Sequence, residues 1–252
     1  MYARKAWVVL IAALTLTLGL AACGDECEDK VQEGGVPGSG NVVTEEMTFA
    51  DFTSVDVENA FAVEIIQSDS FSVTIRVDDN ILDSVDVSKE GGTLRIRLER
   101  GVSVRGDVTL EARVTMPDLE GLELSGASRA SVSGFRSSGE LDIDLSGASA
   151  LDGDLEAGSI DIDASGASTV ELEGSAGGLT IVVSGASTLN LADLTVFTAE
   201  VSLSGASRAT LSVQESIDPV DVSGASTLRY LGDPSLGNVR TSGASTVDKI
   251  GD

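Results

Sequence analysis

The sequence predicts an all-β fold, a solenoid of stacked coils with about 20 residues in each coil. The tetrapeptide Ser-Gly-Ala-Ser occurs seven times in the second half of the chain, and successive copies begin 21, 19, 19, 20, 19 and 19 residues apart. Between the copies, apolar and polar residues alternate, as in Leu141-Asp142-Ile143-Asp144-Leu145, which is typical of a β-strand with one buried side. A unit this short cannot bury its apolar side chains alone, so it is expected to stack on its neighbours.

Each Ser-Gly-Ala-Ser copy is expected to form a corner between two strands. Glycine allows a positive φ or a close approach of the next coil, alanine is small enough for a narrow bend, and serine hydroxyls satisfy backbone groups at the bend. A catalytic motif is needed once, whereas a corner is needed in every coil, so the repeat indicates a structural role. The predicted corner glycines are Gly126, Gly147, Gly166, Gly185, Gly205, Gly224 and Gly243.

The composition divides the chain into a signal segment (1–22), an acidic, glycine-rich tether (23–40) and a single β-solenoid domain (41–250). Within the domain, residues 121–250 hold the regular repeats, and residues 41–120 are expected to form larger coils and an aromatic cap, with a separate small β domain as the alternative. The larger coils are suggested by two degenerate copies of the repeat, one over 55–65 and one over 85–94 with a longer corner.

The first residues resemble a bacterial lipoprotein signal. Arg4 and Lys5 precede an apolar run that is too short for a comfortable membrane span. The run ends in Leu20-Ala21-Ala22-Cys23, which resembles a lipobox, and this resemblance implies that Cys23 is acylated and becomes the mature N-terminus. We therefore expect a lipid-anchored protein of the bacterial cell envelope, facing the periplasm or the cell exterior, with the bilayer as a partner. A signal-anchor helix or an ordinary cleavage site are the alternatives, and Cys27 is then an idle thiol or a link to a second molecule.

The chain is strongly acidic, with 16 basic and 41 acidic residues and a formal charge of −25. Removal of residues 1–22 takes away Arg4 and Lys5 and no acid, which brings the charge to −27. This balance disfavours nucleic acid and anionic membrane surfaces as partners. It fits either cationic ligands such as Ca²⁺ or a charged surface that prevents aggregation.

The composition also argues against an enzyme. The chain has no histidine, which removes the commonest general base and most zinc sites. Residues 23–252 contain no tryptophan and one tyrosine, Tyr230, so the aromatic platforms that usually bind sugars are scarce. We expect no catalytic residues and no cofactor, and a polysaccharide-acting enzyme is the less favoured alternative.

Acidic residues recur at the same strand positions in two neighbouring repeats. Asp142 and Asp144 are followed one coil later by Asp161 and Asp163. If these side chains point outward, the four carboxylates form a weak Ca²⁺ site or a glycosidase-like acid pair, with a solvated outer face as the simpler interpretation.

Two further patterns concern the surface. The residues directly after each corner would form a threonine row, but arginine and alanine interrupt it: Arg129, Ala150, Thr169, Thr188, Arg208, Thr227 and Thr246. The final coil leaves a sheet edge, which Asp248, Lys249 and Asp252 are expected to guard against pairing with other chains.

Nearly all of residues 41–250 resembles the head GIN domain family, also described as auto-transporter adhesins. The resemblance rests on segments 52–57, 62–67, 92–96 and 116–128, of which Pro117-Asp118-Leu119-Glu120-Gly121-Leu122-Glu123-Leu124-Ser125-Gly126-Ala127 is the most telling. It implies a right-handed parallel β-helix and an envelope location, and it supplies no catalytic or binding residues. The expected role is a non-enzymatic binding or adhesion surface for an envelope or host polymer or protein, or alternatively a structural or accessory component without its own ligand. The oligomeric state stays open.

Overall fold

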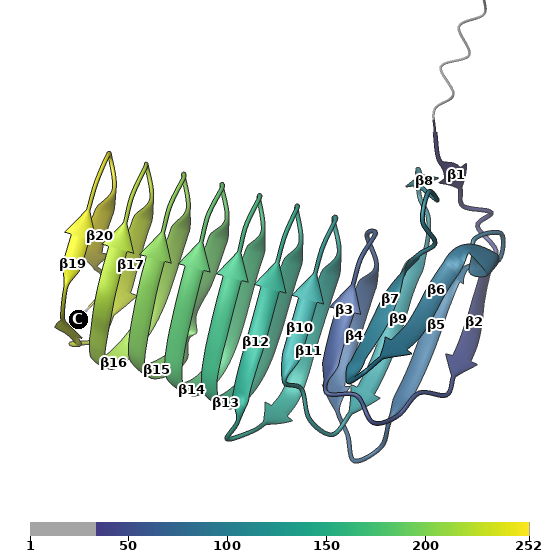
Figure 1. The fold of residues 1–252 in the computed structure, drawn as a ribbon, viewed down its shortest axis with the longest axis horizontal. Helices are drawn as coiled ribbons and strands as arrows, with labels where there is room; N and C mark the ends of the chain where they lie inside the picture. Colours follow the sequence, from purple (N-terminus) through teal and green to yellow (C-terminus); the bar gives the residue numbers. More distant parts are fainter. Residues whose placement is uncertain (1–33, 252) are drawn as a thin grey trace, which may run out of the picture. The chain divides into compact units, whose positions relative to one another are not determined.

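The computed structural model describes residues 34–251, which form one compact unit. Apart from a single turn of 3-10 helix, η1 (Leu82–Ser84), the regular structure in this range is entirely β, as predicted (Figure 1). None of its helices has the length and hydropathy needed to cross a bilayer. The strands are β1 (Val36–Pro37), β2 (Val42–Met47), β3 (Ser54–Val57), β4 (Ala62–Gln67), β5 (Ser72–Asp78), β6 (Val85–Glu90), β7 (Thr93–Leu98), β8 (Val104–Arg105), β9 (Leu110–Met116), β10 (Gly121–Leu124), β11 (Arg129–Arg136), β12 (Glu140–Leu145), β13 (Ala150–Ala164), β14 (Thr169–Val183), β15 (Thr188–Leu203), β16 (Arg208–Val222), β17 (Thr227–Leu231), β18 (Ser235–Leu236), β19 (Val239–Thr241) and β20 (Thr246–Lys249).

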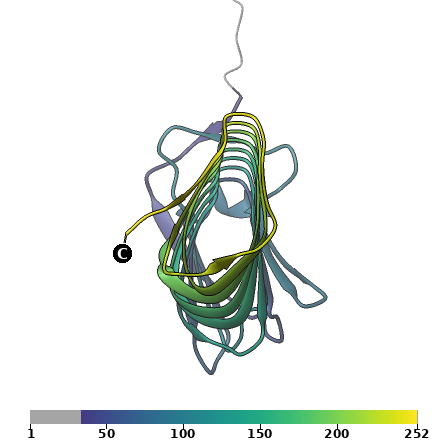
Figure 2. The same ribbon diagram turned by 90° about the vertical axis from the view of Figure 1, so that its left-hand side faces the viewer.

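The coils stack through parallel pairing on two sides, which we call face A and face B. Face A consists of β6, β7, β3, β10 and β12, then the second halves of β13–β16, and finally β18 and β19. Face B consists of β2, β5, β9, β4 and β11, then the first halves of β13–β16, and finally β17 and β20. Figure 2 looks along the stack and shows the two faces as the long sides of a narrow loop. The predicted solenoid is confirmed.

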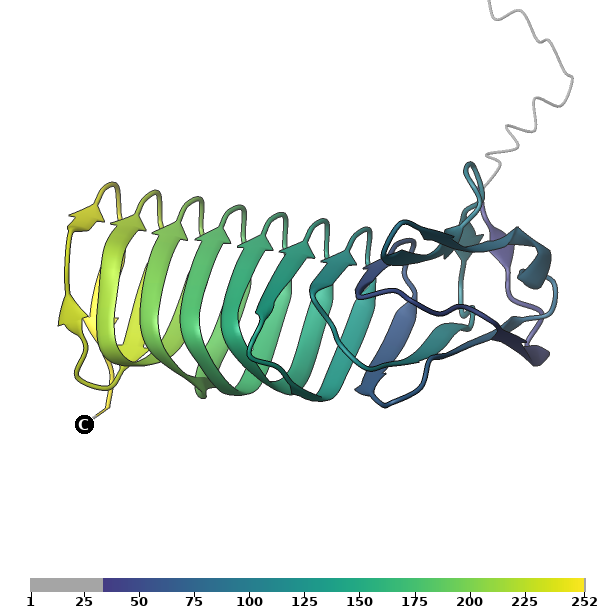
Figure 3. The same ribbon diagram turned by 60° about the horizontal axis from the view of Figure 1, so that its bottom comes forward.

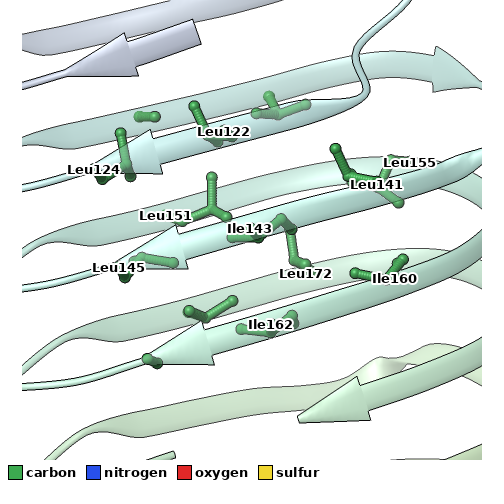
Figure 4. Close-up of a cluster of buried hydrophobic side chains, with 14 of the residues drawn as sticks. Leu122, Leu124, Leu141, Ile143, Leu145, Leu151, Leu155, Ile160, Ile162 and Leu172 are labelled. Carbon is green, nitrogen blue, oxygen red and sulfur yellow. The ribbon is translucent and has the colours of Figure 1, made fainter. Parts of the chain in front are cut away.

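Alternation along each strand builds the core between the two faces. In β12, Leu141, Ile143 and Leu145 are buried and the residues between them are exposed. The register places Ile143 beside Ile162, so like side chains stack from coil to coil (Figure 4). Each coil therefore covers the apolar residues of the next one, and the stack shares one continuous core.

The Ser-Gly-Ala-Ser copies form a row of tight turns along one edge of the stack (Figure 1). Their glycines all have positive φ values, from 73° to 77°. From the second turn onward, the alanine N–H donates to the carbonyl of the glycine one coil earlier, with N···O distances of 2.7–2.9 Å. The inter-coil ladder thus continues around the corner. The alanine lies exposed at the tip, and the second serine turns inward. This serine is buried in the first six copies and half-buried at Ser245 in the last copy.

The opposite edge has no tight turn. Strands β13–β16 continue from face B around this edge to face A without a break, as Figure 3 shows. The pairing between β15 and its neighbours shifts register here, between Leu191 and Thr195 for example. Extra residues in the longer coils are therefore accommodated at this edge and not at the glycine corners.

The N-terminal part combines parallel coils with antiparallel strands. The coil made by β3 and β4 lies between the coils β7–β9 and β10–β11, so its place in the stack differs from its place in the sequence. Beyond it, β6 pairs antiparallel with β7, while β5 pairs antiparallel with both β9 and β2. Phe52 and Phe61 are buried in this region, and the rings of Phe52 and Phe71 have centroids 4.9 Å apart.

Antiparallel pairing corrects one interpretation of the sequence. Residues 55–65 do form a strand, a corner and a second strand in register with the regular coils. Residues 85–94, in contrast, form no degenerate corner, because β6 and β7 are the two arms of a hairpin on face A. A short loop containing Gly91 (φ 60°) and Gly92 between alternating strands favours a hairpin, since its backbone twist matches that of the two arms.

The corner at Asn59 replaces glycine by other means. Asn59 and Ala60 both have positive φ, at 60° and 67°. Asparagine tolerates this conformation better than most residues, and its Oδ1 accepts a hydrogen bond from the backbone N–H of Leu98. This coil has Gly126 as its neighbour on one side, at the start of the glycine row.

We predict that Gly166→Ala destabilises the solenoid strongly. Alanine pays about 1–3 kcal/mol for the left-handed conformation, and its Cβ collides with the carbonyl oxygen of Gly147 in the neighbouring coil. Urea unfolding followed by circular dichroism measures the loss. Gly178→Ala is the control, because its Cβ meets the nearest atoms at 3.8 Å, and it should change stability by less than about 1 kcal/mol. Equal effects of the two substitutions would contradict this role of the corner.

Candidate functional site

The predicted acidic residues come together on face A. Asp142 is opposite Asp161 and Asp144 is opposite Asp163 in neighbouring strands, about 4.8 Å apart. Three of these side chains are exposed and Asp161 is half-buried, so all four point away from the core. They border a hollow of about 270 Å³ that also contacts Thr180 and Val182.

Glu140 extends this group, and it was missed as a candidate from the sequence. Carboxylate oxygens of Glu140, Asp142 and Asp161 lie within 4.8 Å of one another, a spacing that a divalent cation can bridge. Glu140 lies two residues before Asp142 on the same side of β12, and this alternation was the signal that could have found it. We call Glu123, Glu140, Asp142, Asp144, Asp161 and Asp163 the acidic patch.

The acidic patch raises the pKa values of its own members. The charges of Asp142 and Asp161 raise the pKa of Glu140 above its ordinary value. Burial and then the charge of Asp163 raise the pKa of Asp144. For Glu123, burial is the larger cause of the raised pKa, followed by the charge of Asp56. A bound cation would relieve the repulsion that raises the pKa of Glu140.

Asp56 ends the acidic row on the N-terminal side. It lies opposite Glu123 in the sheet and is only 6% exposed. One carboxylate oxygen accepts a hydrogen bond from Arg95 Nε at 2.8 Å, which raises the pKa of Arg95 further. The other oxygen, Oδ1, has no hydrogen-bond donor among the described residues.

Face B has a depression of about 550 Å³ over β2, β5, β9, β4, β11 and β13, which we call the face-B depression. Arginines and acids alternate across it. Arg113 pairs with Glu64 at 3.0 Å and Arg76 pairs with Glu111. Arg129 forms no salt bridge with any described residue, so its guanidinium stays available to a ligand. The remaining lining includes Thr44, Thr74, Ser131 and Asp152, with Ala62, Val63 and Ala112.

The residues after the corners form one exposed or half-exposed row on face B. The row runs from Ala62 through Arg129, Ala150, Thr169, Thr188, Arg208 and Thr227 to Thr246. Of its two arginines, Arg129 lines the depression and Arg208 lies outside it.

The corner glycines occupy structural positions. Gly126, Gly147, Gly166, Gly185, Gly205, Gly224 and Gly243 all lie at exposed turns. The buried serines behind them are held internally, as in Ser168, whose Oγ donates to the carbonyl of Ser165 at 2.8 Å. Cys23 and Cys27 lie outside the described residues.

Comparison with known proteins identifies relatives by family and by fold. A family model described as "Putative auto-transporter adhesin, head GIN domain" matches residues 51–234. No curated protein is significantly similar to the chain.

Solved structures share the fold at low sequence identity. A crystal structure described as a putative adhesin from Bacteroides fragilis has a TM-score of 0.76 and 21% identity, with 86% of this chain and 100% of that chain covered. A putative adhesin from Parabacteroides merdae has a TM-score of 0.66 and 18% identity, over 86% and 100% of the two chains. A structure described as a putative lipid binding protein, from Parabacteroides distasonis, has a TM-score of 0.63 and 19% identity, over 86% and 99%.

These structures establish the solenoid architecture, and the family model covers well over half of the sequence. On the strength of that match, this chain belongs to the head GIN domain family.

Proposed function

We propose that this protein is a non-enzymatic bacterial envelope protein whose solenoid presents a binding or adhesion surface. The supporting observation is the in-register stacking of the coils, which places outward-facing side chains at equivalent positions in each coil along both faces. Such an array suits an extended, repetitive partner, because each coil offers one contact to one unit of a polymer. Membership of a family described as adhesins supports the same role.

The face-B depression is the proposed contact site for that polymer. Its arginines and carboxylates offer donors and acceptors in equal measure, and Arg129 contributes a cation without an internal partner. In a chain with a net charge of −25, this locally balanced lining repels anionic groups of a polymer less than the acidic patch does. The hydroxyls of Thr44, Thr74 and Ser131 add neutral hydrogen-bonding groups.

Reversal of the arginine charge tests this site. Arg129→Glu is expected to reduce binding at least about tenfold, since it removes the unpaired donor and adds repulsion next to Asp152. The assay measures retention of the purified protein on peptidoglycan sacculi, lipopolysaccharide, mucin and collagen. Arg208→Glu makes the same charge change in the same row outside the depression and should bind like the native protein.

Equal binding by both variants would reject the face-B depression as the contact site. Absence of binding to every probe would favour the alternative, a structural or accessory envelope component without its own ligand. Release of soluble sugar from the glycan probes would favour the third possibility, a polysaccharide-acting enzyme.

Cation binding by the acidic patch is a second candidate function, favoured by the spacing of Glu140, Asp142 and Asp161. The chemistry of the donors fits Ca²⁺, which takes several carboxylate oxygens in flexible geometry. Protons compete for the same oxygens, so binding should weaken as the pH falls toward the raised pKa of Glu140.

Calorimetric titration with CaCl₂ tests the cation site. We expect binding heat from the native protein and at least about a tenfold loss of affinity in Glu140→Gln/Asp161→Asn, because the number of charged ligands sets the affinity. The control is Asp152→Asn/Glu171→Gln, which removes a pair of neighbouring acids from face B. If native protein gives neither heat nor a thermal shift, the acidic patch is a solvated surface.

We also propose that Cys23 is acylated and holds the protein on a bilayer. Two or three acyl chains bind a membrane firmly, since each buried CH₂ contributes about 0.8 kcal/mol. Cells fed an alkyne fatty acid should label the native protein and Cys27→Ala but not Cys23→Ala, because only Cys23 follows the lipobox-like segment. Label retained in Cys23→Ala would overturn the assignment. Separately, protease treatment of intact cells distinguishes display on the cell exterior from display in the periplasm.

A further inference from the structure

The two ends of the solenoid are built differently. At the N-terminal end, antiparallel strands β2, β5 and β6 extend the sheets beyond the last parallel coil. At the C-terminal end, inward-facing positions that are buried one coil earlier become open. Val220 is fully buried whereas Val239, its register partner, is 42% exposed. Ile217 is likewise fully buried and its partner Leu236 is 39% exposed.

The backbone at this end also projects N–H and C=O groups that have no partner among residues 34–251. The carbonyl of Asn238 and the N–H of Ser242 bond to the preceding coil, as do the N–H groups of Thr246 and Ile250. Since alternate residues of a parallel strand direct their N–H and C=O to the same side, the residues between them direct these groups away from the stack. On β19 these are Val239 and Thr241, and on β20 they are Val247 and Lys249.

The predicted guard residues leave this edge accessible. The Lys249 ammonium pairs with Asp233 within its own coil, so its charge is turned back toward the protein. Asp248 lies exposed on β20, and Asp252 is outside the described residues. On the other face, Arg240 is 73% exposed although it contacts Asp221 at 3.5 Å. The edge therefore carries an exposed cation on face A and an exposed anion on face B.

We propose that the C-terminal coil is a docking surface for a second copy of this chain. A two-fold axis parallel to the strands places face A of one protomer in line with face B of its partner. Strand β19 then runs antiparallel to β20 of the partner subunit, and the pair occurs twice. Arg240 of each protomer lies near Asp248 of the partner subunit, and Val239 and Leu236 are covered.

This arrangement accounts for three features of the C-terminal edge. It pairs the projecting backbone groups, it covers the exposed apolar residues, and it brings the opposite charges together. In the alternative arrangement, face A of one protomer continues into face A of its partner. This would place the two Arg240 side chains together, and like-charge repulsion disfavours it. The partner that best fits the edge is therefore the same edge of another copy, rotated as described.

The test is the mass of the full chain in detergent micelles, measured by sedimentation with a reducing agent present, so that no free thiol forms a disulfide link. We expect a concentration-dependent dimer. Val239→Lys should give only monomer, because it places a charge in the covered contact. Val182→Lys is the matched control, since Val182 is a similarly exposed valine (45%) in the middle of face A, and it should remain dimeric.

Two further variants separate the interface from effects on folding. Thr241→Pro removes an N–H that points away from the stack, which edge strands tolerate, so it should abolish the dimer while the melting temperature stays within a few degrees. Arg240→Asp should weaken the dimer about tenfold or more through repulsion of the partner's Asp248. Adding Asp248→Arg to that variant should restore the dimer to within about threefold of native affinity.

A native chain that stays monomeric at all concentrations overturns the proposal. So does a ladder of larger oligomers, which indicates head-to-tail stacking on the N-terminal end. A dimer that survives both Val239→Lys and Thr241→Pro forms elsewhere on the molecule and equally overturns it. These outcomes are independent of ligand binding at the face-B depression, since the two surfaces share no residues.

Discussion

The contact of one corner glycine with the next fixes the geometry of the whole stack. From Gly126 to Gly224, the carbonyl of each corner glycine accepts the N–H of the alanine in the following coil, and the glycine of that coil packs against the same carbonyl with no room for a Cβ. Because this contact recurs between successive Ser-Gly-Ala-Ser corners, neighbouring coils have little freedom to slip. A slip of one residue would turn every inward side chain outward, so the row of glycines also keeps the apolar residues in the core.

Fixed register has a direct effect on the surface. Outward side chains lie in rows, so each one lies beside the residues at the same strand position in the two adjacent coils. On face A, acids lie beside acids, and the charges of Asp142 and Asp161 raise the pKa of Glu140. Arginine and acid alternate in the face-B depression, where ion pairs such as Arg113–Glu64 form between neighbouring strands. One fold thereby supports two chemically distinct surfaces.

The repeats were predictable from the sequence because local chemistry determines them. A period of 19–21 residues, two-residue alternation and a glycine in each unit specify coil length, inward side and corner without any information from distant residues. The arrangement of the N-terminal strands was harder to predict from the sequence. Nothing in residues 41–120 indicates that β3 and β4 insert between β7–β9 and β10–β11, because that placement depends on pairing partners far apart in the chain. The hairpin at Gly91 was marked locally, by the Gly-Gly pair, but repeat symmetry favoured the wrong interpretation. For the candidate site, outward acids were predictable from alternation, whereas the face-B depression combines six strands that are separate in the sequence and has no sequence signature.

The smooth edge opposite the corners has an implication for how such a protein changes over generations. The coils join through identical corners. The other edge accommodates the insertion or loss of a residue through shifts in the pairing of β15. A single coil can therefore be gained or lost as a unit during evolution. Duplicating or deleting a single repeat lengthens or shortens the rod by about 4.8 Å and leaves both ends as they were. The length of the solenoid can thus change by whole coils while the terminal structures are preserved.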